Sequence, residues 1–312
     1  MDVILHLGAH RCATTSFQSY LRLNADRLRA QQIGSWGPRR TRAGLFSGLV
    51  PGPRAATGRD AQRQAIGRVQ VNLQRSAESG LAHLLVSDEN MMGSLRENLA
   101  ICDLYCGVGE RVARHLAAFD GHVTGLMLNI RSLDMYWASA MAYAATTGLS
   151  RGLPHSHSIA RIAASRRGWR DVISDIASVA PGLRLQVLPF ETFAGRPETQ
   201  VQALTGQTVP RDHARERLSV APRLPELRAS LGPDPRLEGG DTGRWMPFDP
   251  DQAAALRETY ADDIMWLTAG ADGLAQLIRD PDRKQAGQTP PSQDKTRGRH
   301  HDTDQRRLAG AG

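Results

Sequence analysis

Cysteine is scarce in this chain, and its sequence contains no long apolar run. The 312 residues include three cysteines, Cys12, Cys102 and Cys106, an odd number that is too small for the disulfide framework of a secreted domain. No apolar run approaches the roughly 18 residues that a membrane-spanning helix needs. No charged segment with a following apolar stretch precedes the first predicted strand. We therefore expect reduced thiols, no membrane span and a cytoplasmic location.

Aromatic residues are also few, at 5% of the chain, whereas hydrophobic and charged residues have the ordinary globular shares of 40% and 23%. This length and composition suit one large domain with a sizeable core. The formal net charge of +7 favours polyanionic ligands, because a basic field concentrates them near a cleft. Nucleic acid would fit the charge equally well. However, the sequence lacks the basic clusters with interleaved aromatic residues that base stacking needs, so we expect no nucleic-acid partner.

Short apolar runs alternate with segments of helical periodicity along most of the chain. We predict strands at residues 3–7, 81–87, 122–130 and 183–188 and, among the helices, 61–79, 108–119 and 169–179. This alternation predicts an α/β domain over residues 1–279, with a mostly parallel central sheet flanked by helices. Residues 280–312 contain no aromatic and almost no large apolar residue, so we predict a disordered polar tail there.

The first predicted strand leads through a glycine-bearing turn into a helix. Thr14, Thr15 and Ser16 follow the turn, and apolar residues then recur at helical spacing. Such a junction directs backbone N–H groups and the positive end of a helix dipole at one point, where a phosphate binds well. The nucleotide pattern G-x-x-x-x-G-K-[ST] aligns from Gly8 onward, but Ala13 stands at the second glycine and Thr14 at the lysine. The sequence therefore predicts a phosphate loop without the nucleotidase lysine.

Polar and charged residues follow two further strands. Arg131 comes directly after the strand at 122–130, and Ser139 follows eight residues later in a helix. The arginine offers a bidentate fork for a second phosphate, and the serine adds a neutral donor. Glu89 follows the strand at 81–87, where open α/β sheets place their ligand crevice. The alternative there is that Asp88 or Asn90 only caps the next helix.

The first loop and the Arg131–Ser139 pair, in this order, resemble motifs of the PAPS-dependent sulfotransferases. The loop of that family is commonly written K-[ST]-G-T-T, and this chain has Arg11-Cys12-Ala13-Thr14-Thr15. A later K-G-R-x-x-P loop of the family is matched at Gly243, Arg244 and Pro247, with Thr242 in place of the lysine. The resemblance implies a P-loop-like sulfotransferase fold and PAPS as the sulfuryl donor, with no metal. The donor-binding residues that it implies are His10, Arg11, Cys12, Ala13, Thr14, Thr15, Ser16, Arg131, Ser139, Gly243 and Arg244.

Family knowledge implies transfer of the sulfuryl group to a hydroxyl or amine of a small-molecule, lipid or glycan acceptor, which releases adenosine 3′,5′-bisphosphate. Arg11 would stabilise the developing charge, and Glu89 is our candidate for the base. This chain departs from the loop pattern of that family at two positions that affect the expected chemistry. Arg11 stays charged, so it cannot give a proton to the leaving group as a lysine can. A left-handed conformation at Ala13 would cost roughly 1–2 kcal/mol, so we expect the turn to avoid it.

Two other functions stay open. A P-loop kinase or other NTPase requires a lysine at position 14 and a strand that ends in an aspartate for Mg²⁺. A non-catalytic basic protein would bind nucleic acid or other anions through charge alone. The acceptor cannot be predicted, because residues 37–60, 148–167 and 209–241 show no recognisable pattern. We expect the segment 209–241, rich in Arg, Pro and Gly, to run across the surface.

Overall fold

The computed structural model describes residues 1–50, 59–238 and 243–280. Contacts within the chain divide it into two units, Met1–Arg279 and Asp280–Gly312. The predicted polar tail at 280–312 lies, apart from its first residue, outside the described residues.

A single six-stranded sheet forms the centre of this unit. Its order is β2-β3-β1-β4-β5-β6, and every neighbouring pair is parallel. The strands are β1 Asp2–His6, β2 Ile33–Trp36, β3 His83–Ser87, β4 Val123–Ile130, β5 Arg184–Pro189 and β6 Gln276–Leu277. The predicted α/β fold with a mostly parallel central sheet is therefore confirmed.

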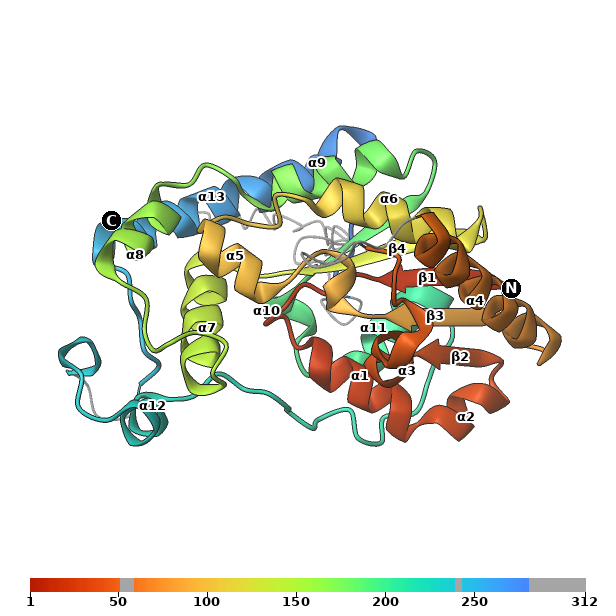
Figure 1. Ribbon diagram of the computed structural model, residues 1–312, viewed down its shortest axis with the longest axis horizontal. Helices are drawn as coiled ribbons and strands as arrows, with labels where there is room; N and C mark the ends of the chain where they lie inside the picture. The colour runs from red at the N-terminus through yellow and green to blue at the C-terminus, as the bar shows by residue number, and fades with distance from the viewer. Residues whose placement is uncertain (51–58, 239–242, 281–312) are drawn as a thin grey trace, which may run out of the picture. The chain divides into compact units, whose positions relative to one another are not determined.

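Helices connect the strands and flank the sheet (Figure 1). The α-helices are α1 Thr14–Leu23, α2 Ala25–Ala30, α3 Pro38–Arg40, α4 Arg59–Glu78, α5 Leu95–Ile101, α6 Val108–Phe119, α7 Leu133–Thr146, α8 Ser156–Ala164, α9 Trp169–Val179, α10 Phe190–Phe193, α11 Pro197–Thr205, α12 Leu224–Leu231 and α13 Pro250–Thr268. Four single turns are the π-helical η1 Thr41–Leu45 and the 3₁₀-helical η2 Glu89–Met91, η3 Pro235–Leu237 and η4 Ala271–Gly273. Within the described ranges, no helix combines the length and the apolar character needed to cross a bilayer.

Both faces of the sheet are buried, because successive strand residues point to opposite sides. In β1, Val3 and Leu5 belong to the core cluster that also contains residues of α4, α6, α9 and α13. Ile4 belongs to the second cluster, together with Phe17 and Tyr20 of α1 and residues of α2, α10 and α11. The near-continuous apolar character of the strands follows from this two-sided burial.

Two strands were missed in the sequence. The edge strand β2 has only four residues and contains Gly34, which favours a loop in sequence analysis. The glycine leaves room for the Leu81 side chain, which would have to shift if residue 34 had a Cβ. The other missed strand, β6, has two residues.

The helical segment after the first loop is interrupted at Asn24, between α1 and α2. Asn24 is buried, and its side-chain Nδ2 donates to Tyr20 O (3.1 Å) and to Asp212 O (2.9 Å). An asparagine that bonds to backbone carbonyls competes with the helical ladder. This residue therefore separates α1 from α2.

Candidate functional site

The carboxyl ends of β3, β1 and β4 are tied together by a buried histidine. His6 Nδ1 lies 2.7 Å from Ser87 Oγ, and His6 Nε2 lies 2.8 Å from Asn129 Oδ1. Burial lowers the pKa of His6 to about 4, although its hydrogen bond to Asn129 and the charge of Glu89 act in the opposite direction. A neutral imidazole therefore joins three strands directly below the loop that follows β1.

That loop approaches the end of β3 closely at Gly8. A Cβ on Gly8 would lie 2.7 Å from Glu89 Cβ, and the residue has a left-handed φ of +93°. Hydrogen bonds with Asn129 secure the loop on its other side, since Ala9 N donates to Asn129 O (3.0 Å) and Asn129 N donates to Gly8 O (2.5 Å). A glycine is required here by both space and backbone conformation.

Our expectation that the turn avoids the left-handed region at Ala13 was wrong. Ala13 has φ 63° and ψ 19°, and Arg11 is also left-handed with φ 60°. Each left-handed non-glycine residue costs roughly 1–2 kcal/mol, a strain typical of functional loops. Alternation of the backbone between the two hands turns successive N–H groups toward one concave side, where anions bind. In this loop the N–H groups of His10 and Cys12 are bonded within the protein, so an anion would be bound by the N–H groups of the residues that follow them.

The loop ends in a helix terminus that no side chain of the described residues caps. Ala13 is the N-cap of α1 and has no polar side chain. The hydroxyl of Thr14 donates back to Ala9 O at 2.7 Å, so it stabilises the turn. The first N–H groups of a helix have no intrahelical partner, and the helix dipole adds positive potential there. These groups are available for an anionic ligand.

A cavity of about 360 Å³ opens in front of this terminus. Among its lining residues are His10, Arg11, Ala13, Thr14, Thr15, Ser16, Glu89, Arg131, Ser139 and Arg244. The structure thus brings together most of the residues that we predicted to act at one site, although they come from segments that are far apart in the sequence. Their binding of a donor stays a prediction.

Two predicted site residues do not line the cavity. Cys12 is buried in the core, where desolvation raises the pKa of its thiol to about 12, and its N–H lies 3.4 Å from Ala9 O. Gly243 precedes the lining residue Arg244, but its carbonyl accepts a hydrogen bond from Leu224 N (3.0 Å). The spacing of a sequence motif does not reveal which side chains turn inward.

Arg11 crosses the cavity instead of pointing into solvent. Its Nε donates to Ser139 Oγ (3.0 Å), and one terminal nitrogen donates to Ser219 O (2.9 Å). The guanidinium carbon lies 4.3 Å from the centre of the Tyr143 ring, within cation–π range. Burial lowers the pKa of Arg11 to about 10, so the group is still charged at neutral pH. Its contacts preorganise a cation in the site.

Arg131 lies beneath the loop and is only 4% exposed. It donates to Arg11 O (3.1 Å), and its guanidinium carbon lies 4.2 Å from the Phe190 ring centre. Burial is the main cause that lowers its pKa, and the neighbouring charge of Arg244 adds to this effect. The described residues provide no ion pair for Arg131. A buried cation without a carboxylate partner is costly unless a ligand supplies the negative charge.

Glu89 is a carboxylate held by two side chains. Its Oε1 lies 2.8 Å from Arg42, and its Oε2 accepts a hydrogen bond from Gln18 Nε2 (2.9 Å). Burial alone would raise the pKa of Glu89, but Arg42 and His10 outweigh it, so the pKa is lowered. Asp88 accepts from Asn90 N (3.0 Å) and caps η2. Thus the neighbouring Asp88 serves as the cap, while Glu89 lines the cavity.

His10 faces the same cavity, and its hydrogen bonds determine its tautomer. Tyr105 OH accepts from Tyr136 OH (3.2 Å) and from His10 N (3.1 Å), so its own proton points to His10 Nδ1, 2.8 Å away. Nε2 therefore carries the ring proton and faces Asn90 Oδ1 at 3.3 Å. Burial lowers the pKa of His10. With a proton on Nε2 and an occupied Nδ1, this tautomer of His10 has no free lone pair.

Sequence reasoning missed part of the cavity wall. Leu218, Ser219, Val220 and Ala221 line the cavity, and Leu218 N donates to Ser16 Oγ (2.9 Å). We expected this segment to run across the surface, so that expectation was incomplete. Tyr143 was also missed, although it lies four residues after Ser139 on the same helix, a spacing that places both on one face. No comparable local signal marks residues 218–221.

Glu191 lines the cavity and anchors two other segments of the chain. Its Oε1 accepts from Ser132 N (3.0 Å) and its Oε2 from Tyr260 OH (2.7 Å). Among the described residues, no group of three or more His, Cys, Asp or Glu side chains could hold a metal ion. In comparisons with known proteins, no family model matches the chain, and no curated protein matches it significantly.

Proposed function

We propose that the protein is a sulfotransferase that moves a sulfuryl group from PAPS to a hydroxyl or amine of an acceptor. One observation carries this proposal. The uncapped helix start at residues 13–16 and the guanidinium of Arg131 line the same cavity, so two separate anion-binding elements face one ligand. PAPS carries two such anionic groups, the 5′-phosphosulfate and the 3′-phosphate.

In the proposed reaction the loop after β1 holds the 5′-phosphosulfate, and Arg131 holds the 3′-phosphate. The acceptor oxygen or nitrogen forms a bond to sulfur while the bond from sulfur to the bridging phosphate oxygen breaks. Adenosine 3′,5′-bisphosphate leaves with the electron pair of that bond, and Glu89 takes the acceptor proton. Arg11 and the backbone N–H groups stabilise the charge on the leaving phosphate, a preorganised electrostatic effect.

The contacts of two residues make an NTPase less suitable. The Thr14 hydroxyl, at the position of the nucleotidase lysine, is bonded to Ala9 O. Asp88, which follows β3, accepts from Thr41 Oγ1 (2.5 Å) and from Arg42 (2.7 Å). An aspartate occupied in this way is poorly placed to organise Mg²⁺ as NTPases require.

A ligand-dependent melting experiment tests the proposal. At a concentration one hundred times its dissociation constant, a ligand that binds only the folded state adds about 2.7 kcal/mol to the free energy of unfolding. We expect adenosine 3′,5′-bisphosphate to raise the melting temperature by roughly 5–10 °C and ATP with Mg²⁺ to raise it much less. Equal shifts would favour the NTPase, and a shift with duplex DNA alone would favour a basic binding protein.

A further inference from the structure

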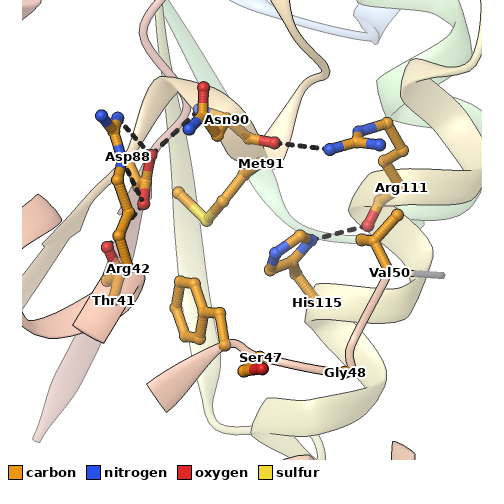
Figure 2. A pocket seen from close by; sticks show the side chains of 11 residues that line it. Thr41, Arg42, Ser47, Gly48, Val50, Asp88, Asn90, Met91, Arg111 and His115 are labelled. Atoms are coloured by element: carbon orange, nitrogen blue, oxygen red, sulfur yellow. Dashed lines mark hydrogen bonds and ion pairs between the residues drawn. The ribbon is translucent and has the colours of Figure 1, made fainter. Parts of the chain in front are cut away.

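A second cavity, of about 450 Å³, lies beyond the carboxyl ends of β2 and β3 (Figure 2). Three segments form it: the chain after β2, the turn after β3, and α6. Its lining residues are Thr41, Arg42, Phe46, Ser47, Gly48, Val50, Asp88, Asn90, Met91, Arg111 and His115. A volume of this size is within the range of small-molecule pockets.

The second cavity shares a wall with the candidate donor site. Glu89 lines the first cavity, and its carboxylate is paired at 2.8 Å with Arg42, which lines the second. Asn90 lines the second cavity, and its Oδ1 lies 3.3 Å from Nε2 of His10, which lines the first. The turn after β3 therefore contributes side chains to both cavities, and the candidate base belongs to this turn.

Arg111 lines the second cavity, and the carboxylates of Glu97 and Glu110 act on its positive charge only at longer range. It donates to Asn90 O (2.9 Å), but its Nε is buried without a hydrogen-bond partner. No ion pair of Arg111 occurs in the part of the chain that the structure describes. Arg42, in contrast, is paired with Asp88 and Glu89. Of the two guanidinium groups in this cavity, only that of Arg111 lacks a carboxylate, so a negatively charged ligand group would satisfy it.

His115 presents a hydrogen-bond acceptor to the same cavity. The side chain is 4% exposed, and its Nδ1 lies 2.7 Å from Arg111 O, so Nδ1 carries the ring proton. Burial lowers the pKa of His115 to about 4, which keeps the ring neutral and leaves a lone pair on Nε2. Phe46 packs edge-on against this ring at 5.2 Å, and Met91 adds a further apolar surface. The cavity therefore combines an apolar surface, a buried hydrogen-bond acceptor and, besides the paired Arg42, one arginine without an ion pair among the described residues.

We propose that this second cavity binds the acceptor, a small molecule whose anionic group pairs with Arg111 and whose hydroxyl or amine reaches the turn after β3. This inference rests on the proposed sulfotransferase function and identifies the chemical class of its acceptor. The apolar part of the acceptor contacts Phe46 and Met91. The transferred sulfuryl group comes from PAPS in the first cavity, and the acceptor proton goes to Glu89.

Calorimetric titration of two probes that share a 4-hydroxyphenyl group, one ending in a carboxylate and the other in a neutral alcohol, tests this assignment. The probes are 4-hydroxyphenylacetate and its neutral counterpart 2-(4-hydroxyphenyl)ethanol, each titrated with and without adenosine 3′,5′-bisphosphate. We expect the wild type to bind the acid at least tenfold more tightly than the alcohol. Arg111→Met should weaken binding of the acid by about tenfold to a hundredfold and leave the affinity for the alcohol unchanged, because only the charged hydrogen bonds are lost.

Two further variants separate a specific contact from a general loss of charge. Arg114→Met removes an arginine from the same helix, one that pairs with Glu110 at 2.8 Å and does not line the cavity, and it should leave binding of the acid unchanged. Arg111→Lys should restore part of the affinity. Equal affinities for the two probes in the wild type, or no binding of the acid, would overturn the proposal.

The nucleotide provides a separate readout. If Arg111→Met weakens the binding of adenosine 3′,5′-bisphosphate as strongly as that of the acid, Arg111 only positions the turn after β3. The assignment of this cavity to the acceptor is then wrong. If the nucleotide does not bind the wild type at all, the sulfotransferase proposal fails. Titrations without nucleotide still show in that case whether the cavity prefers the acid.

Discussion

Replacing Glu89 by glutamine is expected to lower sulfuryl transfer by about 10²- to 10⁴-fold, the range for the loss of a general base. The amide keeps the size of the side chain but cannot take the acceptor proton. Binding of adenosine 3′,5′-bisphosphate should stay within about threefold of the wild type, because Asp88 still pairs with Arg42. The measurement is release of adenosine 3′,5′-bisphosphate from PAPS with a panel of small alcohols and phenols as acceptors.

The pH dependence of turnover tests the same role of Glu89. A base works in its deprotonated form, and the pKa of Glu89 is lowered because Arg42 and His10 outweigh the effect of burial. Turnover should therefore stay flat through neutral pH and fall only below the ordinary carboxyl range. Glu258→Gln, a change at an exposed position of α13 and outside both cavities, is the control and should retain full turnover. Glu89→Gln turnover equal to that of this control would show that Glu89 is not the base.

Replacing Arg131 by alanine is expected to weaken the binding of adenosine 3′,5′-bisphosphate by about tenfold to a few hundredfold. Hydrogen bonds to charged groups contribute roughly 1.5–3 kcal/mol, and loss of the arginine leaves the bound 3′-phosphate without its partner. Adenosine 5′-phosphosulfate has no 3′-phosphate, so its affinity should change little. Calorimetry with both ligands measures the difference.

Arg11→Ala is the matched variant, since it removes a second arginine from the same cavity. It should weaken the binding of both ligands, because each of them carries a 5′-phosphate group. Arg131 donates to the backbone carbonyl of residue 11, which alanine keeps, but the two guanidinium charges act on each other, so the double variant should deviate from additivity. If Arg131→Ala weakens the binding of both ligands equally, Arg131 has a structural role. In that case the assignment of the 3′-phosphate to Arg131 is wrong.

The two elements to which we assign anion binding could be located from the sequence because their signals are local. An apolar run followed by glycine and a helix start describes the loop after β1, and Arg131 is recognisable as the first residue after a strand. In a parallel sheet the residues that follow adjacent strands meet at one edge, so their proximity followed from the predicted fold. β1 lies between β3 and β4, as that argument requires.

Other parts of the site depend on contacts between distant segments, and the sequence offers no signal for them. Arg11 bonds to Ser219, which is 208 residues away, through a segment without periodicity. We paired Ser139 with Arg131, but its hydroxyl accepts from Arg11. The strained turn at Ala13 was missed because local propensity argues against it, whereas the contacts of the loop with Asn129 and Tyr105 hold the backbone in place.

A crystal structure with adenosine 3′,5′-bisphosphate tests the central claim most directly. We predict the 5′-phosphate against the backbone N–H groups at the start of α1 and the 3′-phosphate within hydrogen-bond distance of Arg131. A nucleotide bound outside this cavity, or one whose 3′-phosphate lies away from Arg131, would contradict the assignment of the donor site and with it the proposed sulfotransferase activity.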